Sequence, residues 1–369
     1  MILSFCGCQE EVKTYEPSGK IVKIGFIGPV SGASESWGKN SLLGVKAALQ
    51  VKPFLLNGDR PEIVVADDMN DPDQAKNVVK KLVEDDGVTA ILLASGSNSV
   101  LGVKGLLEKY KIPTIALLAT HPDVAYGEYI TQLPFDDTLQ GTVAALYVLD
   151  EMIVDRATVF MDSSDVQSVF LAETFADKFK DAGGDVEVIE LSSDAMGLEK
   201  TLMECRDRGE EFFYLPIHAA GVVEIEMVSR KLGYDPKVML SDGLLSRIIL
   251  EYDNDLSLVE GMMAIDVYSN VLLTKGYGEK LAKTFDASFT EPKTTFAALG
   301  AEGMSILLEA MDRCGNSQDT ECVNRSIHNT NDFLGVNSKI SINSDGKAER
   351  PIFINTIVNN KLHFEVMIY

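Results

Sequence analysis

Short apolar runs alternate with longer amphipathic segments along most of this chain. Residues 21–27 form the first apolar run and predict a buried strand, and residues 38–51 predict the helix that follows. The alternation continues to a strand over residues 237–240. Strands that alternate with helices are typical of parallel sheets covered by helices. The pattern therefore predicts an α/β protein with two doubly wound parallel sheets.

The same pattern predicts the elements between these ends. Further strands are expected at residues 62–66, 89–93, 113–118, 157–161, 185–191 and 211–215. The helices are expected at residues 73–85, 98–110, 139–153, 167–182, 198–208 and 219–232. After Gly261 the pattern changes to two helices, at 276–289 and 295–314, and to a strand pair within 350–369. Asn359-Asn360-Lys361 suits a tight hairpin between these last strands.

Hydroxyl side chains follow two neighbouring predicted strands, at the point where each strand ends. Ser97 follows the strand at 89–93, and Thr120 follows the strand at 113–118. Ligands of open parallel sheets bind outside the carboxyl ends of the strands, and helix N-termini attract anions. The two residues could therefore hold a carboxylate. The alternative for Ser97 is an ordinary N-cap of the next helix.

The charge of the chain excludes some classes of partner. Its 369 residues include 33 basic and 56 acidic side chains, which gives a net charge of −23. Nucleic acid and anionic lipid surfaces would repel such a protein. No apolar run reaches membrane-spanning length, and the length of the chain permits two domains.

The N-terminal residues differ from the rest of the chain. The apolar segment 1–5 is too short for a complete signal peptide and is interpreted as the end of one. Phe5-Cys6-Gly7-Cys8 resembles a bacterial lipoprotein cleavage box, with Cys8 as the lipidated residue. Residues 1–19 would then be a signal remnant and a tether, and the lipid would be the one membrane contact. The alternative is an ordinary disordered terminus.

Two cysteines near the C-terminal end, Cys314 and Cys322, flank a polar loop between helical segments. An exported protein could oxidise them to a disulfide, and two free thiols are the equal alternative. No Cys or His spacing in the sequence fits a zinc site, so neither a metal nor a cofactor is expected.

Motifs of catalysis are missing from the sequence. The loop at residues 32–40 departs from a phosphate-binding P-loop, because Asn40 stands where a magnesium-binding hydroxyl is needed. No G-x-G-x-x-G, G-x-S-x-G or H-E-x-x-H motif occurs. A hydrolase assembled from Ser97, His121 and Asp242 has no support in their spacing. We therefore expect no enzymatic activity.

Three further residues are candidates for a binding site. Trp37, the single tryptophan, lies in a polar loop after the first strand and could either wall a pocket or anchor the loop. Asp242 follows the strand at 237–240 and is either part of an Asp-Gly turn or a carboxylate in a cleft. His218 follows the strand at 211–215 and faces either the same cleft or solvent. Hydroxyls from one lobe and a carboxylate from the other would suit a zwitterion.

Several motifs occur in a specific order along the chain. They are KIGFIGPVSG (23–32) followed by Trp37-Gly38, ADDMNDPDQA (66–75), the Ser97 region, IPTIALLATHP (112–122) and LSDG (240–243). In this order they resemble the branched-chain amino-acid-binding family of ABC-transporter substrate-binding proteins, over almost everything after Lys20. The resemblance implies the periplasmic binding protein type 1 fold, with two Rossmann-like lobes joined by three crossovers that close on a ligand.

The resemblance also assigns residues to the backbone of an amino-acid ligand. Ser97 and Thr120 would bind the ligand carboxylate. The carbonyl of Leu118 and the side chain of Asp242 would bind its ammonium group.

Other residues would surround the ligand side chain. Trp37 matches an aromatic residue that covers it in the family. Val166 and His218 stand where the best-known members have aromatic walls, so the preference is expected to differ from strict leucine.

The expected first lobe comprises residues 20–138 and 267–345, and the expected second lobe comprises residues 139–266 and 346–369. The expected function is that of a periplasmic or extracytoplasmic receptor, a monomer that binds an apolar or aromatic amino acid and delivers it to an ABC permease. The alternatives are a sensor domain for an amide or an aromatic acid, and a hydrolase.

Overall fold

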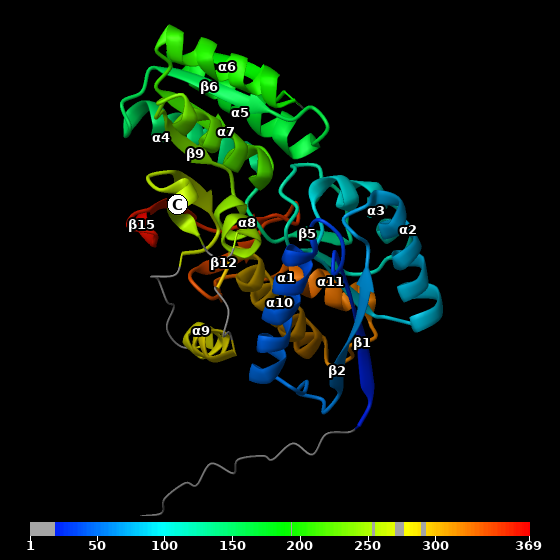
Figure 1. The fold of residues 1–369 in the computed structure, drawn as a ribbon. Helices are drawn as coiled ribbons and strands as arrows, with labels where there is room; N and C mark the ends of the chain where they lie inside the picture. The colour runs from blue at the N-terminus through cyan, green and yellow to red at the C-terminus, as the bar shows by residue number, and fades with distance from the viewer. Residues whose placement is uncertain (1–18, 193, 253–254, 270–276, 289–292) are drawn as a thin grey trace, which may run out of the picture.

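The chain folds around two large β-sheets, each flanked by helices, in an upper and a lower lobe (Figure 1). The computed structural model describes residues 19–192, 194–252, 255–269, 277–288 and 293–369. The predicted signal remnant with Cys8 and nearly all of the predicted tether lie outside these residues, as do the ends of the helix predicted at 276–289. The predicted α/β class with two lobes is confirmed.

The first lobe is built on a parallel sheet with the strand order β2-β1-β3-β4-β5. The strand order reverses between β1 and β3, and such switch points are where ligands of open α/β sheets bind. The strands are β1 (Ile21–Gly28), β2 (Arg60–Asp67), β3 (Ala90–Leu93), β4 (Thr114–Ala116) and β5 (Ile130–Gln132). The helices of this lobe are α1 (Glu35–Val51), α2 (Pro72–Lys80), α3 (Ser97–Tyr110), α9 (Tyr277–Ser288), α10 (Thr295–Cys314) and α11 (Thr320–His328).

The second lobe is built on a sheet with the order β15-β14-β10-β9-β8-β6-β7. Its parallel part is β6 (Arg156–Met161), β7 (Asp185–Glu190), β8 (Phe212–Leu215), β9 (Lys237–Leu240) and β10 (Met263–Asp266). Its helices are α4 (Asp137–Asp150), α5 (Val166–Asp181), α6 (Ala195–Arg208), α7 (Ala219–Lys231) and α8 (Leu244–Glu251).

The predicted C-terminal hairpin is confirmed and extends the second sheet. β14 (Ile352–Ile357) and β15 (Leu362–Ile368) are antiparallel, and β14 pairs with β10. Asn359 and Asn360 have φ angles of 54° and 58°, the left-handed backbone that a two-residue hairpin turn requires.

The short elements are those that the hydrophobic pattern did not predict. The strands among them have two to four residues and α8 has eight, so each offers few positions to show a period. These elements are β5, α8, β10 and a small sheet of β11 (Phe333–Leu334), β12 (Lys339–Ile342) and β13 (Ala348–Glu349). α11 corresponds to the helical segment that the sequence predicts, without bounds, after the loop between Cys314 and Cys322.

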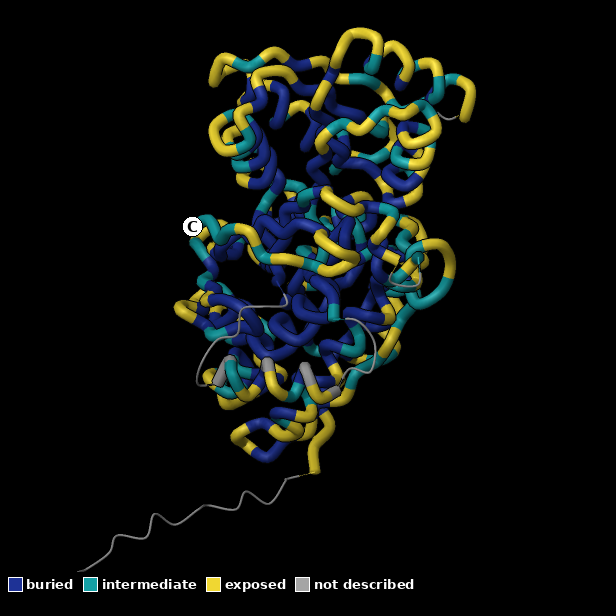
Figure 2. Tube along the Cα trace, turned by 60° about the vertical axis from the view of Figure 1, so that its left-hand side comes forward, coloured by how far each residue is buried: buried dark blue, intermediate teal, exposed yellow. Residues whose placement is uncertain are grey.

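The core of each lobe lies between its sheet and its helices, and exposed residues lie on the outer surface (Figure 2). Every residue of β3 (AILL) and of β8 (FFYL) is buried. Central strands of a parallel sheet are covered on both faces, so they consist of continuous apolar runs. This is why the sequence predicted them.

Two glycines allow α1 and α10 to pack closely in the first lobe. A Cβ atom at Gly44 would overlap the backbone of Ala297, and one at Gly300 would overlap the backbone of Ser41. The close packing brings the starts of both helices together, where the ring centroids of Trp37 and Phe296 are 6.2 Å apart.

Cys314 at the end of α10 and Cys322 in α11 form a disulfide, with Cα atoms 5.9 Å apart. The structure therefore contains the disulfide that the sequence left open against two free thiols. Cys205 in α6 is buried and free.

The chain passes between the two large sheets after β5, after β10 and after β13, and Arg350 joins these crossings. Arg350 is itself in the third crossing. Its guanidinium donates to the carbonyls of Leu133 at 3.4 Å and Val267 at 3.1 Å, in the other two. It also pairs with Glu302 of α10 at 3.0 Å, and both side chains are only 1% exposed.

Replacing Arg350 by Met should lower the free energy of unfolding by about 3–5 kcal/mol, because Glu302 would keep an unpaired buried charge. The double variant Glu302→Gln, Arg350→Met removes that charge and should recover part of the loss. Urea denaturation of the three proteins checks this. A double variant less stable than Arg350→Met alone would contradict the assigned role of the pair.

Candidate functional site

The carboxyl ends of both sheets face each other and enclose a cavity of about 240 Å³. Its lining residues follow β1, β2 and β3 in the first lobe and β6, β8 and β9 in the second. The volume lies below the roughly 300–1,000 Å³ of sites for drug-sized ligands, which suits a smaller solute. The lining residues are Trp37, Asn70, Pro72, Gly96, Ser97, Asn98, Ser164, Asp165, Gln167, His218 and Arg247.

Ser97 lies at the first-lobe wall of this cavity. α3 begins at Ser97, and the N-cap position belongs to Gly96, so the alternative of a capping serine is not what the structure shows. The Ser97 hydroxyl instead accepts a hydrogen bond from the His121 amide at 3.3 Å and thereby links the segments after β3 and β4. Because Gly96, Ser97 and Asn98 all line the cavity, free amides of the first helical turn lie at its wall.

Gln167 connects the two lobes beside the cavity. Its side-chain amide, at the start of α5, donates to the Thr120 hydroxyl at 2.7 Å and to Asp242 Oδ1 at 3.2 Å. The hydroxyl that follows β4 and the carboxylate that follows β9 are therefore joined by one nitrogen donor. Thr120 is fully buried by this arrangement.

Asp242 receives a second set of bonds from Gln140 of α4. The Gln140 amide donates to Asp242 Oδ1 at 2.9 Å, and the Asp242 backbone N–H donates to Gln140 Oε1 at 2.7 Å. Both side-chain amides thus bond the same oxygen, and Oδ2 of Asp242 has no partner among the described residues. Asp242 also lies in a turn before Gly243, whose φ is 71°, as the turn interpretation expects. Its carboxylate adjoins the cavity through Gln167 but is not among the lining residues.

Burial raises the pKa of Asp242 to about 6, although its bonds from the two glutamines favour ionisation. The pKa values of two neighbouring carboxyl groups are also raised. Burial and the charge of Asp242 hold the pKa of Asp137 well above its usual range, and burial raises that of Asp266 to about 7. A cation that reached Asp242 would favour its ionised form. The cluster is therefore electrostatically suited to a positively charged group.

Trp37 lies in the first turn of α1 rather than in the predicted loop, and it is only 8% exposed. Its indole N–H donates to Glu251 Oε1 of α8 at 3.2 Å, across the boundary between the lobes. The guanidinium of Arg247 lies over its ring, 4.4 Å from the centroid. The aromatic face is thus covered by a cation.

His218 lies at the second-lobe wall of the cavity, whereas Val166 does not line it. His218 is the N-cap residue of α7 and lines the cavity, with Nδ1 3.1 Å from an Arg247 nitrogen. Arginine only donates, so His218 Nδ1 accepts and Nε2 carries the proton. Nε2 lies 3.9 Å from Asp165 Oδ2.

Val166 begins α5 and is 39% exposed, but it is not among the lining residues. Its neighbours Ser164, Asp165 and Gln167 do line the cavity.

The structure thus gathers most of the predicted site residues. Trp37, Ser97 and His218 line the cavity, and Thr120 and Asp242 adjoin it through Gln167. Leu118, like Val166, is not part of the lining.

The sequence reasoning missed Gln140, Gln167 and Arg247. Neutral amides belong to no motif, so the two glutamines gave no signal. Arg247 stands in α8, a helix too short to predict, although its place just after the LSDG motif could have drawn notice.

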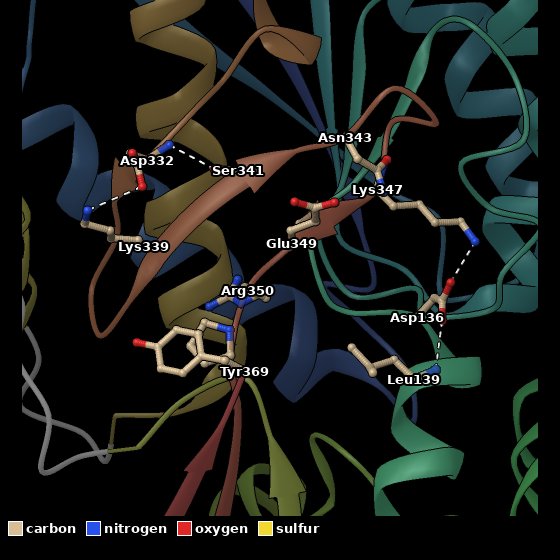
Figure 3. A pocket seen from close by; sticks show the side chains of 12 residues that line it. Asp136, Leu139, Asp332, Lys339, Ser341, Asn343, Lys347, Glu349, Arg350 and Tyr369 are labelled. Carbon is tan, nitrogen blue, oxygen red and sulfur yellow. Dashed lines mark hydrogen bonds and ion pairs between the residues drawn. The ribbon is translucent and has the colours of Figure 1, made fainter. Parts of the chain in front are cut away.

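A second, larger cavity of about 480 Å³ lies beside the crossings between the lobes (Figure 3). Its charged groups largely pair with one another: Lys347 bonds Asp136 at 2.7 Å, and Lys339 bonds Asp332 at 3.3 Å. Its lining comes mostly from residues 332–351, around the small sheet of β11, β12 and β13. We therefore take the smaller inter-lobe cavity as the functional site.

Within the described ranges, no group of three or more His, Cys, Asp or Glu side chains is arranged to hold a metal ion. Within the same ranges, no helix combines the length and apolarity needed to cross a membrane.

Two α/β lobes with a polar cavity between their facing strand ends define a solute-binding receptor. The sequence model described as periplasmic binding protein matches residues 21–361, and the chain belongs to this family. Its members bind solutes and are not enzymes, and membership implies an extracytoplasmic location.

Individual relatives agree with this assignment. The leucine-, isoleucine-, valine-, threonine- and alanine-binding protein of Pseudomonas aeruginosa is 23% identical over 82% of this chain and 81% of its own length. A leucine-binding protein of Thermotoga maritima has a TM-score of 0.86 at 24% identity, covering 94% of this chain and 98% of that one. A solute-binding protein of Rhodopseudomonas palustris, in complex with 3,4-dihydroxybenzoic acid, has a TM-score of 0.80 at 18% identity, covering 94% and 96%. The fold thus serves both amino acids and aromatic acids.

Without ligand, Asp242→Asn should be more stable than the parent by about 1–3 kcal/mol at pH 8, and by about half as much at pH 5. Ionised Asp242 costs stability because its folded-state pKa is raised to about 6. That cost is complete above pH 6 and disappears as the pH falls toward the unfolded-state pKa. Urea denaturation at both pH values measures the difference. A variant less stable than the parent at pH 8 would contradict the conclusion that ionised Asp242 costs stability.

Proposed function

We propose that this chain is an extracytoplasmic receptor that binds an amino acid between its lobes and delivers it to an ABC permease. The observation that carries the proposal is Asp242. Two amides hold its Oδ1, and its Oδ2 has no partner among the described residues. This carboxylate adjoins a cavity whose opposite wall consists of a serine hydroxyl and helix N-terminal amides.

The arrangement of Gln167 supports Asp242 as the partner of the ligand ammonium. One nitrogen of Gln167 already donates to both Asp242 Oδ1 and Thr120 Oγ1. An ammonium group offers three such donors and a positive charge. It would bond the free Oδ2 of Asp242 and compensate the buried carboxylate. The Leu118 carbonyl remains a further predicted acceptor.

The opposite wall supports a carboxylate position. The Ser97 hydroxyl can donate a hydrogen bond while it accepts one from the His121 amide. α3 begins at this wall, and a helix N-terminus favours negative charge. Ser97 and Thr120 would thus bind the carboxylate, while Asp242 binds the ammonium group.

An aromatic acid without an amine is the main competing ligand, because a structural neighbour is bound to one. Such a ligand carries negative charge only, and it would leave Asp242 without a cation. This favours an amino acid over a benzoate-like ligand. Delivery to a permease, a monomeric state and a lipid anchor at Cys8 accompany the proposal on the basis of the family and the N-terminal motif.

Asp242→Asn should weaken binding of the native amino acid by about two to three orders of magnitude, because the ammonium would lose its buried counter-charge. Thr120→Ala should cost less, about 1–3 kcal/mol, the loss of one charge-assisted hydrogen bond. Calorimetric titration of both variants, with benzoate as the amine-free comparison, tests the proposal. An Asp242→Asn protein that binds amino acids as tightly as the parent would refute it.

Affinity should also fall as the pH drops below about 6, by up to roughly tenfold per pH unit, because protonated Asp242 has no charge to offer. Asp266, whose pKa burial raises to about 7, and Asp137, whose pKa burial and the charge of Asp242 raise well above its usual range, lie in the same region. Titrations at pH 5, 6 and 7.5 measure the effect, and the Asp242→Asn variant isolates it. Parent and variant with the same pH profile would assign the effect to another group.

A further inference from the structure

Arg247 occupies the place where an apolar ligand side chain would need an aromatic wall. Among the described residues that line the cavity, it is the one lysine or arginine. Its side chain is only 16% exposed. Its guanidinium covers the ring of Trp37, 4.4 Å from the centroid. The aromatic surface that would pack against a leucine-like side chain is therefore already occupied.

The guanidinium has hydrogen-bond donors left over. One terminal nitrogen lies 3.1 Å from His218 Nδ1. The second terminal nitrogen has no hydrogen-bond partner among the described residues, whereas Nε is buried and faces its ion-pair partner. Its nearest acid is Glu251, at 3.6 Å, whose Oε1 also accepts from Trp37 and Ser36. A buried arginine with unused donors favours a ligand that brings an acceptor.

The other residues that line the cavity are also mostly polar. Apart from Trp37, whose ring Arg247 covers, Pro72 is the one apolar side chain in the wall. A hydrocarbon side chain would leave the polar groups without water or a partner, and sites of this kind discriminate against such ligands. The polar side chains are those of Asn70, Ser97, Asn98, Ser164, Asp165, Gln167, His218 and Arg247.

We propose that the bound amino acid has a side chain ending in a carboxylate or a carboxamide, whose oxygen accepts from Arg247. This inference rests on the proposed function and departs from the apolar or aromatic side chain expected from the sequence. A cationic side chain is disfavoured because it would face Arg247. Asp165, which also lines the cavity, would repel a carboxylate but not a carboxamide, so the two chemistries can be separated by experiment.

The test is calorimetric titration of the parent, Arg247→Met and Arg247→Lys with L-glutamate, L-glutamine and L-leucine as separate probes. The parent should bind glutamate or glutamine at least tenfold more tightly than leucine. Arg247→Met should weaken binding of that probe by roughly ten- to a hundredfold and change leucine binding by less than threefold. Arg247→Lys keeps the charge but lacks the planar guanidinium, and its affinity for that probe should lie between those of the parent and Arg247→Met.

Arg230→Met is the matched control, because it removes an equal charge from an exposed position on α7 of the same lobe. It should change the binding of none of the probes. The selectivity ratio is the decisive readout, since a merely structural loss would weaken all three probes equally. Preferred binding of leucine by the parent, or an unchanged ratio in Arg247→Met, would overturn the inference and leave the proposed function standing. Binding of no amino acid at all would overturn both.

Discussion

The buried pair of Arg350 and Glu302 ties the three crossings of the chain together, and the geometry of the cleft depends on it. From one crossing, Arg350 bonds the carbonyls of Leu133 and Val267 in the other two. A buried charge is tolerated only with hydrogen-bonded partners, so the crossings are fixed to each other and to α10. These contacts fix the three crossings where the strand ends of the two sheets meet face to face.

The residues at the facing strand ends are polar, and burying them lowers the stability of the fold. Asp242 lies among Asp137 and Asp266 in a region that disfavours all three charges. Groups that lower stability are tolerated where function needs them, and buried carboxyls with raised pKa values concentrate at functional sites. Gln167 reduces the cost by bonding Asp242 from the first turn of α5. The ligand ammonium would remove the remainder, which links binding to closure of the lobes.

Most of the fold and part of the site could be predicted from the sequence. Long periodic helices and the continuous apolar runs of β3 and β8 are readily predicted. β5 (ITQ) and β10 (MAID) include polar residues and form no continuous apolar run, and α8 has only eight residues. Trp37 and Asp242 could be found because their residue types are conspicuous in a loop or after a strand. Gln167 and Arg247 could not, because their importance comes from partners far away in the sequence. Even Ser97, correctly placed at a helix start, proved to bond His121 rather than cap its helix.

The most direct test of the central claim is a crystal structure of the protein with the ligand it retains from its native source. The account predicts an amino acid in the inter-lobe cavity. Its ammonium nitrogen should lie within about 3 Å of the Asp242 carboxylate, and its carboxylate should bond Ser97 and Thr120. A ligand without an amine, or an ammonium group bound away from Asp242, would contradict the account.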